Sequence, residues 1–139
     1  MNQGVRADFF PDPFPKFGHC PHKLLSPKSR PDVFYQQNHC GVFRSDSAGE
    51  SWTDITGDLP SRFGFVLGIN SQDPDTIYVL PEDEALGDQV CGAKRYVTDA
   101  KMRVFRSRNA GRDWEPMTKG LPRNTPISTF CGKEWRPML

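Results

Sequence analysis

Short runs of β-branched and aromatic residues alternate along the chain with clusters of Gly, Pro, Asn, Asp and Ser. Such runs are typical of short β-strands, and such clusters are typical of turns. The 13 prolines and 12 glycines favour a turn-rich chain over a helical one. We therefore expect an all-β protein with strands over residues 22–26, 33–37, 42–45, 52–56, 63–69, 76–80, 102–106 and 114–117.

An internal repeat divides these strands into two groups. Ser45–Trp52 recurs as Ser107–Trp114, with Ser, Ala, Gly and Trp in the same places and an offset of 62 residues. The match extends to Val-Phe-Arg before each copy and to Leu-Pro after it. A match at a fixed offset indicates two copies of one structural unit.

Each copy reads as a turn between two strands. A serine hydroxyl can bond nearby backbone, Asn109 can close an Asx-type turn, and Gly49 and Gly111 can supply the positive φ that such a turn needs. The pattern resembles the Asp-box, or BNR, repeat, Ser-x-Asp-x-Gly-x-x-Trp. In this chain Ser47 and Asn109 replace its Asp, and either can still make the local turn bond. The residues assigned to this structural turn are Ser45, Ser47, Gly49, Trp52, Ser107, Asn109, Gly111 and Trp114.

The resemblance implies a β-propeller whose relatives are bacterial, intracellular and glycosidase-like. A blade takes roughly 40–50 residues and a closed propeller needs at least about four blades. The 139 residues then hold a propeller fragment of about two four-stranded antiparallel blades. We expect an irregular N-terminal arm over 1–18, blades over 19–60 and 61–122, an inserted loop at 82–100, and an incomplete third blade or truncated tail at 123–139. Open blade edges predict self-association.

Charge and hydropathy narrow the partners. A net charge of +1 favours neither nucleic acid nor an anionic membrane. We find no apolar run long enough to span a bilayer and no secretory signal, and therefore expect a cytoplasmic protein with free thiols.

Strand order predicts which turns share a face. In an antiparallel blade, the second turn and the crossing to the next blade lie opposite the repeat turns. This places the segments 19–22, 38–40 and 61–63 and the loop 82–100 on one face. We expect a protein or carbohydrate-like ligand to bind there, through His19, His22, Asn38, His39 and Arg62.

The histidines and cysteines of this face leave three interpretations open. A zinc site could draw on His19, Cys20, His22, His39 and Cys40, although adjacent residues of an extended strand point to opposite sides. Cys20 or Cys40 could be a nucleophile with a histidine base. The favoured interpretation has polar groups that line a channel mouth, with no cofactor and no catalytic residue.

The leading functional hypothesis is therefore a non-catalytic binding scaffold. The alternative is part of a sialidase-like glycoside hydrolase whose other blades are missing. That activity would require an arginine set and two placed carboxyl groups. The Phe/Tyr-Arg-Ile-Pro motif of the resembled family is absent, and Arg62 is the one arginine placed on the ligand face.

Overall fold

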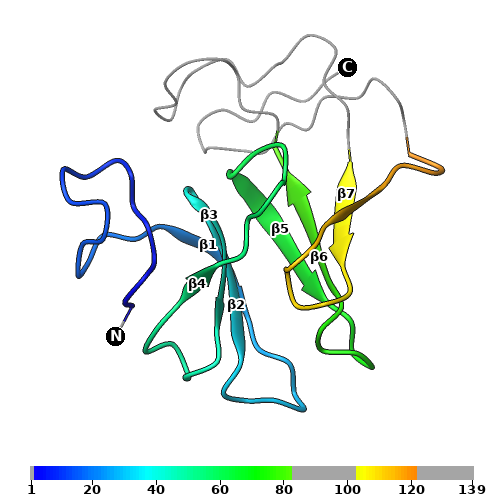
Figure 1. Cartoon of the computed structure of the whole chain (residues 1–139), viewed down its shortest axis with the longest axis horizontal. Coiled ribbons are helices and arrows are strands. Elements are labelled where there is room, and N and C mark those ends of the chain that lie inside the picture. Colours follow the sequence, from blue (N-terminus) through cyan, green and yellow to red (C-terminus); the bar gives the residue numbers. More distant parts are fainter. Residues whose placement is uncertain (1, 83–102, 122–139) are drawn as a thin grey trace, which may run out of the picture.

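The computed structural model describes residues 2–82 and 103–121, and these residues form two four-stranded antiparallel sheets (Figure 1). The first sheet has the order β1-β2-β3-β4 and the second the order β5-β6-β7-β8. The strands are β1 Pro21–Leu25, β2 Phe34–Asn38, β3 Gly41–Ser45, β4 Thr53–Asp54, β5 Gly64–Ile69, β6 Ile77–Pro81, β7 Val104–Ser107 and β8 Glu115–Met117. The all-β prediction is confirmed, and each expected strand overlaps an observed one.

The fourth strand of the first sheet is shorter than expected. The sequence predicts a strand over residues 52–56, but β4 comprises only Thr53–Asp54. The amide of Trp52 donates to the carbonyl of Gln3, 2.7 Å away, so it points toward the N-terminal residues and not along the sheet. Strand propensity alone does not reveal that competing partner.

The core lies between the two sheets. Val33, Tyr35 and Val42 of the first sheet meet Leu67, Ile77 and Val79 of the second, together with Phe105, Ala110 and Trp114. The side chain of Tyr35 is fully buried, and its hydroxyl donates to the carbonyl of Pro74 at 3.2 Å. Apolar burial and a satisfied hydroxyl thus hold one sheet face-to-face on the other.

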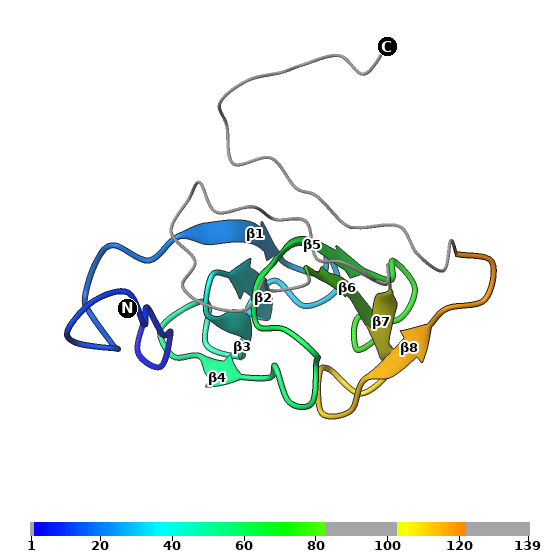
Figure 2. The same cartoon turned by 90° about the horizontal axis from the view of Figure 1, so that it is seen from above.

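The first strand of each sheet, β1 and β5, carries a bulge at an equivalent position. In β1 the pairing jumps from Pro21 to Lys23, which leaves His22 as the extra residue. In β5 it jumps from Gly64 to Val66, which leaves Phe65. The two positions are 43 residues apart, the same offset that relates β2 to β6. Because a bulge turns a side chain away from its regular direction, both strands can aim a residue at the same place. Seen from above, β1 and β5 lie side by side (Figure 2).

The N-terminal residues pack on the side of the first sheet that faces away from the second (Figures 1 and 2). Val5 and Ala7 are buried there, and Gln3 forms a parallel bridge with Ser51. Phe9, Phe14 and Phe17 keep half or more of their surface exposed. Small residues, and not the phenylalanines, therefore anchor this segment.

Two sequence predictions fall where the structure gives no description. The inserted loop 82–100, apart from Glu82, and the tail 123–139 lie outside the described residues. Within residues 2–82 and 103–121, we find no helix of the length and apolarity needed to cross a bilayer.

Candidate functional site

The two bulge residues stack on each other. The rings of His22 and Phe65 are 4.0 Å apart between centroids and inclined by 10°. The His22 ring also meets Phe63 edge-on, at 5.2 Å. His22 comes from the first sheet and both phenylalanines from the start of the second. The two bulges therefore form an aromatic contact where β1 and β5 lie side by side.

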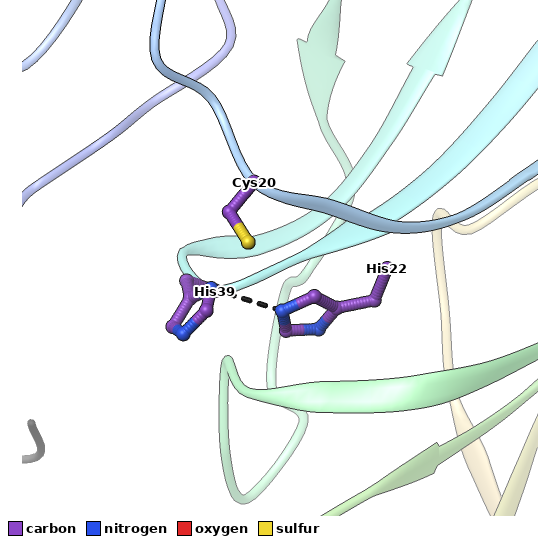
Figure 3. A group of neighbouring side chains, drawn as sticks. All are labelled: Cys20, His22 and His39. Atoms are coloured by element: carbon purple, nitrogen blue, oxygen red, sulfur yellow. Dashed lines mark hydrogen bonds between the residues drawn. The ribbon is translucent and has the colours of Figure 1, made fainter. Parts of the chain in front are cut away.

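His39 joins this contact from the turn between β2 and β3. Its ring centroid lies 4.5 Å from that of His22, 4.9 Å from Phe63 and 5.8 Å from Phe9. His22 Nε2 and His39 Nδ1 are 2.9 Å apart and share a hydrogen bond (Figure 3). We call His22, His39, Phe63 and Phe65 the histidine-aromatic cluster. All four side chains are partly buried.

Hydrogen bonds to backbone carbonyls hold the segments that carry the cluster in place. The buried amide of Gln37 donates to the carbonyls of Asn38 and Gly41 in the β2–β3 turn and to that of Arg62 in the crossing to β5, at 2.9–3.1 Å. His22 Nδ1 lies 2.6 Å from the carbonyl oxygen of Gly64. The turn that carries His39 and the crossing that carries Phe63 are thus tied together by one side chain.

The structure separates the predicted ligand-face residues into two groups. His22 and His39 come together in the cluster. The other three residues are His19, Asn38 and Arg62, and they are instead hydrogen-bonded to residues outside the cluster. The ring of His19 bonds Asn2 and the carbonyl of Val5, at 2.9 and 3.1 Å. Asn38 accepts the amide proton of Cys40, and Arg62 binds both the Cys40 carbonyl and the Asp54 carboxylate.

The five candidate metal ligands also separate. Cys20, His22 and His39 each offer one ligand atom, and these atoms lie within 4.8 Å of one another. Figure 3 shows the Cys20 thiol directed toward the two imidazoles. Cys40 lies elsewhere: its sulfur accepts the amide proton of Asp8 at 3.2 Å. The neighbours His39 and Cys40 form the turn between β2 and β3, and they therefore have different surroundings.

The two cysteines differ in reactivity. Cys40 is 5% exposed, and burial raises the pKa of its thiol. A buried thiol that stays protonated is a poor nucleophile, because thiol chemistry runs through the thiolate. Cys20 is exposed and stands beside two imidazoles. Of these two residues, only Cys20 has surroundings suited to metal binding or nucleophilic chemistry.

Sequence reasoning missed Phe65. The 43-residue offset relates it to His22 and so pairs the two positions in the alignment of the blades. The pattern of strand formers does not show that both positions are bulges, because a bulge shifts pairing without changing composition. The regular alternation of side chains along a strand would not predict that His22 and Phe65 contact each other.

The fold is similar to that of a solved glycosidase-type propeller. An ancestral GH74 enzyme, a β-propeller protein, matches with a TM-score of 0.56 and 13% sequence identity. The match covers 76% of this chain and 13% of that enzyme chain, so this chain spans a small part of its length. At this identity the likeness concerns the fold alone. Neither the protein-family models nor the curated proteins give a match.

Proposed function

We propose that the chain supplies two neighbouring blades of an Asp-box β-propeller and that its histidine-aromatic cluster belongs to a non-catalytic binding face. The observation that carries the proposal is the pair of equivalent bulges, which aim His22 and Phe65 at each other. Bulges of this kind are over-represented next to functional sites. Partly exposed aromatic rings with a few polar atoms are also typical of ligand-binding surfaces.

The repeat turns support the Asp-box assignment by their hydrogen bonds. Ser45 Oγ accepts the amide protons of Ser47 and Gly49, and Ser107 Oγ accepts those of Asn109 and Gly111. The replaced third position keeps its role as well, since Ser47 and Asn109 each accept an amide proton four residues on, at 3.0 Å. These contacts lie within the turns themselves, which supports a structural role for the repeat.

A binding array tests the proposed role. The full chain is applied to immobilised oligosaccharides and peptides, and its Phe65→Ala variant should lose at least about tenfold in affinity for any bound probe. Val66→Ala is the matched control, because Val66 is the next residue of β5 and is 49% exposed. If Phe65→Ala and His39→Ala both bind as the parent does, the face is elsewhere. A chain that binds no probe would count against a self-sufficient module.

The second candidate is a portion of a glycoside hydrolase, favoured by the fold likeness to the GH74 enzyme. A panel of fluorogenic glycosides distinguishes the two. The binding role predicts no release of fluorophore. Release that disappears in a cluster variant would establish the hydrolase instead. Self-association through open edges stays a prediction, and light scattering on the same sample measures it.

A further inference from the structure

We infer that Cys20, His22 and His39 form a binding site for a zinc-class transition-metal cation. This inference goes beyond the proposed function, since a binding face could work without a metal. One thiol and two imidazoles make up a donor set that favours zinc and its neighbours over magnesium or calcium. The three residues come from two segments that only the fold brings together, one at the start of β1 and one after β2.

The spacing of the ligand atoms suits a single ion. Metal bonds of about 2.0–2.3 Å at tetrahedral angles place neighbouring ligand atoms roughly 3.3–3.8 Å apart. The three atoms here lie within 4.8 Å of one another, and the two imidazole nitrogens are 2.9 Å apart. Small rotations of the side chains would open the imidazole pair and draw the sulfur inward.

The hydrogen bonds orient the histidine rings for this task. A carbonyl oxygen can only accept, so the contact of His22 Nδ1 with Gly64 places a proton on Nδ1. In the neutral ring this leaves a lone pair on Nε2, directed at His39. Histidines that bind metals are commonly oriented in this way, with the second ring nitrogen bonded to a backbone carbonyl.

Metal binding would replace the hydrogen bond between the rings. The shared proton belongs to His39 Nδ1, because His22 Nε2 accepts it. A cation placed between the two nitrogens requires this proton to move to His39 Nε2, which keeps the ring neutral. The Cys20 thiol loses its proton to solvent on binding.

The surroundings cover one side of the three residues and leave another side open. The rings of Phe63 and Phe65 contact His22 at 5.2 and 4.0 Å and cover that side of its ring. Cys20 is exposed, so a cation can approach from the other side. Three protein ligands leave a fourth tetrahedral position for water, a bound ligand or another group of the protein. Zinc sites with three protein ligands are typically of the catalytic type.

Cobalt substitution tests the inference on the untagged full chain. Co²⁺ added to chelator-treated protein should give the visible bands of a tetrahedral site and a near-ultraviolet thiolate-to-cobalt band. Added Zn²⁺ should abolish both, at one ion per chain by calorimetry. Cys20→Ser should remove the thiolate band, and His39→Ala should weaken binding by at least about tenfold.

Cys40→Ala and His19→Gln are the matched controls, because these residues lie outside the group. Both should retain the spectrum, and His19→Gln serves alone if Cys40→Ala fails to fold by circular dichroism. Absence of a thiolate band in the parent chain overturns the site, as does a band that survives Cys20→Ser. The glycan and peptide array is run without metal, so its result does not depend on this one.

Discussion

The two repeat turns have the same internal hydrogen bonds but different neighbours. In each, a fully buried serine accepts two amide protons, and the following Ala and Gly have positive φ. The tryptophans differ. Trp114 is 8% exposed, and its indole donates to the carbonyl of Ile55, the residue after β4 of the first sheet, at 2.9 Å. Trp52 is partly exposed, and its indole donates to Gly49 in its own turn.

The difference follows from what lies beside each tryptophan. Trp114 packs against residues of the first sheet. Trp52 lies beside the N-terminal segment, where the carbonyl of Gln3 accepts its amide proton. The local sequence thus determines the turn. The neighbouring sheet determines how much the tryptophan contributes to stability.

Truncation of the tryptophans should produce the largest difference. Trp114→Ala removes a core side chain and a buried hydrogen bond, and we expect a loss of about 3–5 kcal/mol in the free energy of unfolding. Trp52→Ala should cost about 1–2 kcal/mol, since its side chain is partly exposed. Urea denaturation followed by circular dichroism measures both without relying on tryptophan fluorescence.

Trp114→Phe separates the contribution of the buried apolar surface of Trp114 from that of its indole hydrogen bond. It keeps most of the apolar surface and should cost about 1 kcal/mol through the lost indole donor. Equal losses for Trp114→Ala and Trp52→Ala would show that the N-terminal segment stabilises its tryptophan as well as a complete sheet does.

The turn glycines give a second contrast. Gly49 and Gly111 have φ of 88° and 91°, so alanine at either should cost about 1–2 kcal/mol. A methyl group at Gly49 would meet Trp52 Cζ2, 3.7 Å away, and no other atom within 4 Å among the residues that the structure describes. At Gly111 it would lie 2.8 Å from Cβ of Ile55, the residue after β4. Gly111→Ala should therefore cost about 2–4 kcal/mol in total.

Chemical denaturation of the two alanine variants measures this contrast as well. The control is the double variant Gly111→Ala/Ile55→Gly compared with Ile55→Gly alone. Without a side chain at position 55 the clash is removed, and the remaining cost of Gly111→Ala is the φ strain. If Gly49→Ala is as damaging as Gly111→Ala, the first turn has a close neighbour that the sequence repeat conceals.

The sequence predicts most of the fold because the signals for strands and turns are local. Each expected strand overlaps an observed one, and Gly49 and Gly111 have the positive φ that the turn pattern requires. The late start of β4, after Trp52, was not predictable, because the partner of the Trp52 amide is Gln3, far away in sequence.

The candidate site was predicted less completely. Strand order brings His22 and His39 to one face, and the structure joins them by a hydrogen bond. Composition cannot show that His19 is occupied by Asn2. Nor can it show that Phe65 is a bulge residue. Both depend on pairings between distant segments.

The smallest contrast concerns Asp32 and Asp75, each of which is hydrogen-bonded to one of the two repeat turns. The backbone carbonyls of Asp32 and Asp75 make the same bond, to the amides of Ala48 and Ala110 at 2.9 and 2.8 Å. The carboxylate of Asp75 also binds Arg30 with both oxygens, at 2.7 and 3.0 Å, and so links the sheets. Asp32 is exposed and has no ion pair within residues 2–82 and 103–121. Asp75→Asn should therefore lower the melting temperature by about 1–3 °C, a small effect because water screens an exposed ion pair. Asp32→Asn should lower it by less, because this variant loses no ion pair among the described residues.

The pH dependence tests the origin of this contrast. The hydrogen bonds from Arg30 hold the pKa of Asp75 below its usual value, despite the opposing effect of burial. A carboxyl group with a lowered pKa in the folded state contributes stability above its ordinary pKa, about 3.9. That contribution is lost as the pH falls through the lower, folded value. The parent and Asp75→Asn should therefore differ at pH 6, and the difference should shrink as the pH falls below the ordinary pKa of a carboxyl group. High salt should also reduce the difference at pH 6, since the pair is partly exposed. A difference that persists in acid would instead assign it to packing around the amide.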